Sequence, residues 1–308
     1  MKTNVIEYKK CIICTSNEPK IVYSWKKNYY NPDKYETCSW DARYNLAFNI
    51  VRCKKCKHMY TYPSIKKEFL SNVYPQDLIN NNVKPSELKS DKKFLPIINI
   101  ISKYKDSKND LIVDIGTRYG TLPYMLRQGG YRFSFGIELN KSSVEISKKL
   151  DESLVFEGEL KNNLQNILTS TNKENVRFFV FDDVLEHLID PNIELAIMSK
   201  YQKKGDFIIL RQMDNDSLGR KLYRKKWYYY QSAAHMHYFD RRSLENLLKK
   251  YGYKIILIQK PSFFRNIQLF FRQIFMKKRT VKFNNGKFHY LNERKKLRDI
   301  YTYIVVKE

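Results

Sequence analysis

The chain has 308 residues, of which 43% are hydrophobic and 15% aromatic, so it can bury a substantial core and is not intrinsically disordered. Its 57 Lys and Arg residues against 32 Asp and Glu give a net charge of +25, which attracts polyanions, but the charge is spread along the chain and no RNA-binding signature accompanies it. The sequence has no apolar run of about 18 uncharged residues and no apolar N-terminal segment, so we expect a cytoplasmic protein without a membrane span or a signal peptide.

Four of the five cysteines form two C-x2-C pairs in the first 56 residues. Without a secretory signal, pairs of this spacing indicate metal ligation rather than disulfides. Four thiolates bind Zn²⁺ tetrahedrally and can hold together a loop-rich segment that lacks its own core. We therefore predict a zinc-binding domain at residues 1–75, with Cys38 as a buried apolar side chain. The predicted zinc ligands are Cys11, Cys14, Cys53 and Cys56.

Beyond a polar, proline-containing linker at residues 76–92, the hydrophobic pattern changes. A helix, "FLPIINIISKY", precedes five short apolar stretches that alternate with helical patterns: "DLIVDIG", "FSFGIEL", "SLVFEG", "VRFFVFDD" and "DFIILRQ". This alternation predicts an α/β fold with a mostly parallel sheet and helices on both faces. Two further strands, "YKIILIQ" and "YTYIVVK", flank an insertion at about residues 261–297.

The first strand of this region runs into a glycine turn, "VDIGTRYG", and then into a helix. Thr121 is the candidate N-cap of that helix, Pro123 lies in its first turn, and Gly129 follows its end. Such a turn exposes backbone N–H groups and a helix N-terminus at the carboxyl edge of the sheet, where open α/β sheets bind ligands.

Two more features point to the same edge. Glu138 ends the second strand in "GIELN", the position from which a carboxylate can accept hydrogen bonds from both hydroxyls of a ribose. The polar, acidic stretch "FDDVLEHLIDP" follows the fourth strand, where packing alone would favour apolar residues.

Together with "HMHYFDRRSLENLLKKYGY", these stretches resemble the class I S-adenosylmethionine (SAM)-dependent methyltransferases over about residues 94–260 and the final strand. The resemblance implies a Rossmann-like, seven-stranded, mostly parallel sheet with an antiparallel last strand, in a SAM-binding domain at residues 93–308. Asp114, Gly116 and Gly120 match the acidic-x-Gly-x-Gly-x-Gly pattern of the family, whereas Arg118 replaces its middle glycine. By the same resemblance, the remaining cofactor-binding residues are Glu138, Asp182, Asp183 and Val184.

The combination of a four-cysteine domain with a SAM domain is similar to the sugar C-methyltransferases and, more broadly, to zinc-bearing methyltransferases of glycan and secondary-metabolite clusters. His187 in "DVLEH" and His235 in "SAAHMHYF" are the candidate catalytic residues; alternatively, His187 is a polar residue at a helix start and His235 anchors a loop. The C-methyltransferase subgroup has a glutamate where this chain has Ala234, so oxygen methylation is at least as plausible as carbon methylation.

We therefore expect methyl transfer to an oxygen or carbon of a sugar, a nucleotide-linked sugar or a glycan intermediate. The net charge and a pI of about 9.6 favour a second hypothesis, an RNA or DNA methyltransferase. Arg118 and Ala234 favour a third, a non-catalytic zinc-bearing module of the same fold. The basic, aromatic segment at residues 263–279 is suited either to contact with an anionic membrane or to covering its own domain or a partner subunit.

Overall fold

A computed structural model describes residues 6–24, 49–66, 88–231, 235–260 and 299–308. Cys38, Ala234, most of the predicted linker at residues 76–92 and the insertion at about 261–297, with its predicted membrane-contact segment, lie outside the described residues. Within the described part of the chain, no helix is long and apolar enough to cross a membrane.

The larger sheet has seven strands in the order β12-β13-β10-β9-β6-β7-β8. The strands are β6 (Ile112–Ile115), β7 (Ser134–Glu138), β8 (Val155–Glu157), β9 (Phe178–Asp182), β10 (Phe207–Met213), β12 (Tyr253–Gln259) and β13 (Ile300–Lys307). All neighbouring pairs from β10 to β8 are parallel, whereas β13 is antiparallel to both β10 and β12. The predicted seven-stranded sheet with an antiparallel last strand is confirmed. The chain passes outward from β6 to β8 and then returns to β9, so the direction of winding reverses between β6 and β9, where open sheets bind ligands.

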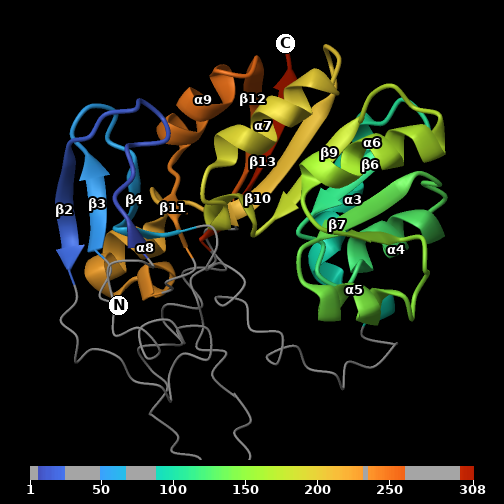
Figure 1. The fold of residues 1–308 in the computed structure, drawn as a ribbon, viewed down its shortest axis with the longest axis horizontal. Coiled ribbons are helices and arrows are strands. Elements are labelled where there is room, and N and C mark those ends of the chain that lie inside the picture. The colour runs from blue at the N-terminus through green and yellow to red at the C-terminus, as the bar shows by residue number, and fades with distance from the viewer. Residues whose placement is uncertain (1–5, 25–48, 67–87, 232–234, 261–298) are drawn as a thin grey trace, which may run out of the picture.

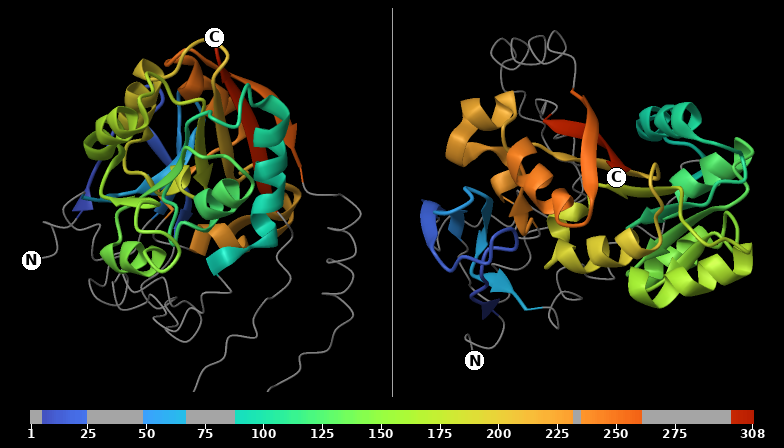
Figure 2. Two further views of the ribbon diagram at one scale, coloured as in Figure 1. Left: turned by 90° about the vertical axis from the view of Figure 1, so that its right-hand side faces the viewer. Right: turned by 90° about the horizontal axis from the view of Figure 1, so that it is seen from above.

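Helices cover both faces of this sheet because successive residues of a strand point to opposite sides. Phe178 packs with α3 (Leu95–Tyr104) and α4 (Thr121–Gln128), and its neighbour Phe179 belongs to the opposite core. The helices of that second core are α6 (Leu160–Thr171), α7 (Pro191–Lys200) and α9 (Arg241–Lys249). Figure 2 shows α3 and α6 on the two sides of the sheet. The shorter helices are α5 (Lys141–Ser147) and α8 (Leu218–Tyr223).

The start of α4 differs from the prediction by one residue. Its N-cap is Gly120, which has a φ of +73°, and Thr121 is already helical without a capping hydrogen bond. The turn requires a left-handed residue at this point, which glycine adopts without a steric penalty. Pro123 in the first turn and Gly129 after the last residue are as predicted.

The cysteine-bearing segment forms a second, four-stranded antiparallel sheet in the order β11-β4-β3-β2. Its strands are β2 (Pro19–Ser24), β3 (Asn49–Cys53), β4 (Met59–Tyr62) and β11 (His237–Tyr238), and a separate pair joins β1 (Ile6–Glu7) to β5 (Ser64–Ile65). Figure 1 shows this sheet beside α9, at the opposite end of the molecule from β7 and α5. Because β11 comes from the C-terminal half of the chain, the two parts of the protein share a sheet. The exact domain boundaries stay a prediction.

Candidate active site

The glycine turn after β6 keeps its shape although an arginine replaces its middle glycine. Gly116, Arg118 and Gly120 all have positive φ angles, of +69°, +59° and +73°. Arg118 therefore adopts the left-handed conformation that a glycine would adopt. Its side chain is exposed, and its guanidinium carbon lies 4.7 Å from the centre of the Tyr119 ring. The arginine thus preserves the backbone of the turn, with its charge directed over an aromatic ring.

Two glycines in this region, Gly116 and Gly136, are required by the close approach of another side chain. A Cβ on Gly116 would lie 2.6 Å from Cγ2 of Val184, so the turn after β6 and the segment after β9 are in contact, as the predicted cofactor site requires. A Cβ on Gly136 in β7 would lie 2.3 Å from Cγ2 of Thr117. Sequence reasoning missed Gly136, although an isolated glycine within a predicted strand is a signal of close backbone approach.

Glu138 lies at the carboxyl end of β7, beside the turn. Its Oε2 accepts a hydrogen bond from the Arg118 N–H at 2.8 Å, and its Oε1 accepts one from the Asn140 N–H at 2.8 Å. Burial raises the pKa of this carboxyl group. An ionised carboxylate has about four acceptor positions, so both oxygens can still accept hydrogen bonds from a diol. Two backbone N–H groups thus fix the orientation of this carboxylate at the carboxyl edge of the sheet.

Asp114 is almost completely buried at the end of β6, with 2% of its surface exposed. Its Oδ1 has no hydrogen-bond partner among the described residues. Burial raises the pKa of Asp114 to about 7, although the adjacent Thr117 side chain lowers it. A buried carboxylate oxygen without a hydrogen bond is destabilising, so this residue fits a ligand that brings a positive charge or a hydrogen-bond donor. The ammonium group of SAM is such a donor.

Asp182 and Asp183 are adjacent, but Asp182 forms ion pairs through its side chain whereas Asp183 is notable for its backbone conformation. The Asp182 carboxylate forms an ion pair with Arg211 of the neighbouring strand β10, and Lys93 Nζ lies 3.4 Å from its other oxygen. Asp183 has a φ of +55°, and its N–H donates to the Arg211 carbonyl at 2.7 Å. Positive φ at a residue other than glycine is found mostly in turns and at functional sites. Sequence reasoning missed Arg211, whose signal is a charged residue inside the apolar strand "FIILRQM".

The two predicted catalytic histidines lie together. His187 ends a short 3-10 helix, η7 (Leu185–His187), directly after β9, and the centre of its ring is 4.7 Å from that of His235. Glu186, which sequence reasoning missed, joins them: one ligand-type atom from each of the three residues lies within 4.8 Å of the others. Burial, with the nearby charge of Asp183, raises the pKa of Glu186 well above its usual range.

His237, two residues further along, belongs to the core instead. It is buried, its ring stacks on that of His58 at 5.5 Å, and its Nδ1 lies 3.3 Å from His58 Nε2. Burial lowers the pKa of His237 to about 4, so it is a neutral ring at physiological pH. Its contacts are those of a packing residue between the two sheets.

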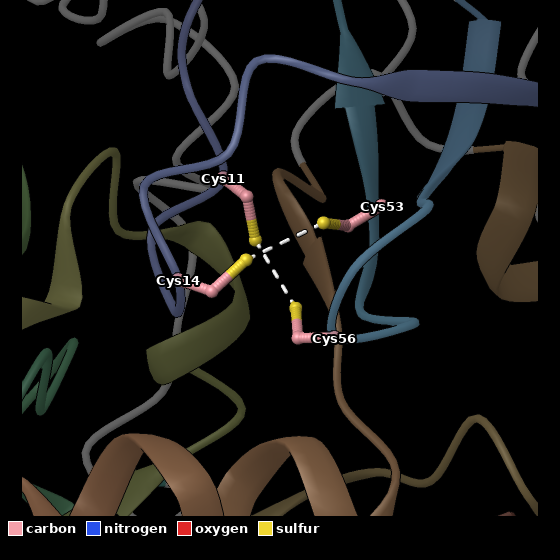
Figure 3. A group of neighbouring side chains, drawn as sticks. All are labelled: Cys11, Cys14, Cys53 and Cys56. Atoms are coloured by element: carbon pink, nitrogen blue, oxygen red, sulfur yellow. Dashed lines mark hydrogen bonds between the residues drawn. The ribbon is translucent and has the colours of Figure 1, made fainter.

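The four cysteines of the predicted zinc site converge, as Figure 3 shows. The sulfurs of Cys11 and Cys56 are 3.4 Å apart, those of Cys14 and Cys53 are 3.5 Å apart, and the whole set lies within 4.8 Å. Tetrahedral zinc with Zn–S bonds of ~2.3 Å requires sulfurs about 3.8 Å apart, so these two pairs are within about 0.4 Å of the required separation.

The two cysteine pairs have the same local geometry. Thr15 and Lys57, each directly after the second cysteine of a pair, have φ angles of +57° and +70°. Their N–H groups donate to the carbonyls of Cys11 and Cys53 at 2.8 and 3.0 Å. Each pair is thus presented by the same tight turn, which directs two sulfurs to one point. The arrangement of two matched turns, which spacing alone does not reveal, supports a metal site.

The cysteine-bearing sheet contacts the histidine cluster directly. The Thr61 hydroxyl donates to the His235 carbonyl at 2.7 Å, and the Thr61 N–H donates to the Met236 carbonyl at 3.0 Å. The Met236 N–H in turn donates to the Glu186 carbonyl at 2.8 Å. Strand β4 therefore holds the segment that carries His235 against η7.

A family model described as "Methyltransferase domain" matches residues 89–258, more than half of the chain. The chain belongs to this family, and with the sheet order described above it is a SAM-dependent methyltransferase of the class I fold. Membership of an enzyme family favours catalysis over the hypothesis of a non-catalytic module. A search of curated proteins gave no match.

Similar folds occur among solved structures. Magnesium protoporphyrin IX methyltransferase from Synechocystis PCC 6803, solved with bound SAH, is 12% identical, with 78% of this chain and 96% of that chain covered and a TM-score of 0.49. A SAM-dependent methyltransferase from Archaeoglobus fulgidus is 15% identical, with 69% and 91% covered and a TM-score of 0.45. A putative methyltransferase in complex with the Haloferax volcanii Trm112 methyltransferase activator is 12% identical, with 68% and 87% covered and a TM-score of 0.44.

Proposed function

We propose that this enzyme methylates a sugar, a nucleotide-linked sugar or a glycan intermediate, with SAM as methyl donor and a structural zinc ion in the cysteine-bearing segment. The observation that carries the proposal is the convergence, at one edge of the sheet, of a ribose-type carboxylate (Glu138), a glycine turn and a histidine pair supported by the cysteine-bearing sheet.

In this proposal each predicted residue has a physical role. Gly116 and Gly120 let the backbone approach the cofactor, Glu138 accepts hydrogen bonds from the ribose, and Asp114 faces the ammonium group of the methionine moiety. Asp183 and Val184 line the pocket, and Asp182 holds that segment through Arg211. SAM, when bound, supplies a methyl group on a positively charged sulfur.

The histidine pair belongs to the acceptor side. A hydroxyl that gains a methyl group must lose its proton, and a positioned imidazole or cation assists that loss. His187 follows β9, whose neighbour β6 carries the glycine turn, and the His235 ring lies 4.7 Å from that of His187, so we place both beside the proposed cofactor pocket. A polar acceptor with ionisable hydroxyls, such as a sugar, fits this chemistry better than an apolar acceptor.

The decisive experiment is titration calorimetry of the zinc-loaded protein with S-adenosylhomocysteine. Glu138→Ala removes a group proposed to accept two hydrogen bonds, so we expect affinity to fall about 100-fold. The matched control is Glu157→Ala, because Glu157 is exposed and lies directly opposite Glu138 on strand β8. Equal affinities of Glu138→Ala and wild type would reject the assignment of the pocket. Labelled SAM that stays unconsumed with a panel of nucleotide sugars would reject the acceptor class.

The net charge of +25 keeps a nucleic-acid acceptor as the second candidate. This candidate requires binding whose affinity falls steeply and linearly with the logarithm of salt concentration. Fluorescence anisotropy with labelled RNA and DNA at several salt concentrations, followed by methyl-transfer assays on any nucleic acid that binds, separates it from the sugar proposal.

A further inference from the structure

We infer that Glu186, His187 and His235 form a second metal site, which binds a divalent transition-metal cation at the acceptor side of the pocket, distinct from the four-cysteine site. The inference deepens the proposed function and rests on it for the placement of the acceptor, but the metal site itself is argued from the geometry of this cluster alone.

The donor set and its spacing suit a cation. One atom from each of the three residues lies within 4.8 Å of the others, and two imidazoles with one carboxylate are a common ligand set for divalent transition metals. Ligand atoms at ~2.1 Å from one ion lie at most about 4.2 Å apart, so side-chain adjustments of less than an ångström close the set. Three protein ligands leave coordination positions for an acceptor.

Glu186 provides independent support. It is 2% exposed, and its Oε2 has no hydrogen-bond partner among the described residues. A buried carboxylate in that state is destabilised unless a cation or a proton neutralises it. A metal ion held between this oxygen and two imidazoles would remove the penalty.

His235 has the tautomer that ligation needs. Its Nδ1 lies 2.8 Å from the backbone carbonyl oxygen of Tyr229. A carbonyl oxygen can only accept, so Nδ1 carries the proton and Nε2 is the ring nitrogen that would bind a metal. Metal-binding histidines usually donate their second N–H to a carboxylate or carbonyl in this way, which fixes the orientation of the ring.

The segments that carry the ligands are held together by hydrogen bonds to their backbone carbonyl groups. The Met236 N–H donates to the Glu186 carbonyl at 2.8 Å, and Thr61 donates to the His235 carbonyl at 2.7 Å. Ligands that are fixed before the metal arrives lose little conformational entropy when it binds. A preorganised site of this kind is expected to select a cation by geometry as well as by charge.

A cation here would specify the type of acceptor. A bound divalent metal lowers the pKa of a coordinated hydroxyl and orients it, and it activates a carbon acceptor only through a carbonyl oxygen next to that carbon. The site therefore requires an acceptor that carries a coordinating hydroxyl or carbonyl oxygen.

The test uses Co²⁺, added to full-length protein whose cysteine site is loaded with zinc. Cobalt bound by nitrogen and oxygen gives weak visible bands, whereas cobalt bound by cysteines adds strong thiolate charge-transfer absorption, so the spectrum tells the two sites apart. We expect one Co²⁺ per chain without thiolate absorption. Glu186→Gln should weaken its binding at least tenfold. The matched control Glu245→Gln, which changes an exposed carboxylate paired with Arg241 on α9, should leave it unchanged.

Two results would overturn the inference: the absence of a cobalt spectrum from nitrogen and oxygen ligands, or equal cobalt affinity in Glu186→Gln and wild type. The three residues would then act only as metal-free acids and bases. Binding of S-adenosylhomocysteine is measured on the same samples and should be unchanged by Glu186→Gln. Cobalt binding without cofactor binding would reject the proposed function while keeping the metal site.

Discussion

The two halves of the active-site edge are built in different ways. Most of the cofactor half comes from one short stretch, residues 112–140, in which strand, turn, helix and strand follow one another, and only the segment after β9 is added to it. The acceptor half combines β4, η7, which lies more than 100 positions later, and the segment around β11, which follows about 50 positions after η7. Local chain geometry therefore forms most of the first half, whereas the second exists only when the two sheets are joined.

This difference predicts that the two halves can be damaged separately. His235→Gln should lower kcat by about a thousandfold, because a positioned group that activates the acceptor contributes typically 10²–10⁴-fold. The affinity for S-adenosylhomocysteine should stay within a factor of about two, since His235 lies outside the glycine turn. Single-turnover rates and calorimetry on the same preparation check both values. A parallel loss of cofactor affinity would show that the halves are not independent.

Zinc removal is expected to have the next largest effect, again on the acceptor half. Loss of the ion would loosen β4, through which Thr61 holds the His235 segment, so methyl transfer should fall at least tenfold while cofactor binding persists. Chelation followed by zinc addition tests this, with activity and calorimetry measured at each stage.

The cysteine site should also depend on pH. Burial raises the pKa of Cys11 to about 11, so zinc must displace a proton from this thiol at neutral pH. Zinc affinity should therefore rise with pH between 6 and 8, which competition with a chromogenic chelator measures. A flat profile would indicate that the cluster binds no metal through thiolates.

The contrast between the cofactor half and the acceptor half also explains which site residues can be predicted from the sequence. Asp114, Gly116, Gly120 and Glu138 can be predicted to lie at one edge of the sheet because spacing along one strand-turn-helix-strand unit fixes their positions in space. Glu186 was missed because "DVLEH" by itself does not show which residue faces His235, which lies nearly 50 positions later.

The shared sheet was missed for the same reason. β11 contributes only His237 and Tyr238 to the cysteine-bearing sheet, and two residues carry too little periodicity to signal a strand. Long-range pairing of this kind depends on tertiary packing, which neither composition nor local pattern encodes.

Within the cofactor half, Asp114 is expected to lower the stability of the cofactor-free protein and to strengthen cofactor binding. Its folded pKa of about 7 lies above the value of ~3.9 for an unfolded chain, so the folded protein binds more protons between pH 4 and 7 and loses stability as pH rises through that range. Asp114→Asn should raise the free energy of unfolding of the cofactor-free protein by about 4 kcal/mol at pH 8, since each unit of pKa difference corresponds to about 1.4 kcal/mol.

The gain should be nearly lost near pH 4, where the folded carboxyl is protonated and the unfolded one, with a pKa of ~3.9, is about half protonated. Urea unfolding at pH 4, 6 and 8 provides the curve, and calorimetry should show that the same variant binds S-adenosylhomocysteine more weakly. Equal stability of variant and wild type at pH 8 would mean that a partner satisfies Asp114 in the free protein.

The smallest effect is expected at Arg118, the position where the chain departs from the family pattern. Arg118→Gly relieves a left-handed conformation that costs about 1 kcal/mol in a residue with a side chain, but it also increases the entropy of the unfolded chain by a similar amount. The contact with Glu138 uses the backbone N–H, which glycine retains. Stability should thus change by less than about 1 kcal/mol and cofactor affinity by less than about threefold. A large gain in affinity would instead mean that the guanidinium group, although it lies over Tyr119, restricts entry to the pocket, and the turn would then regulate binding rather than only support it.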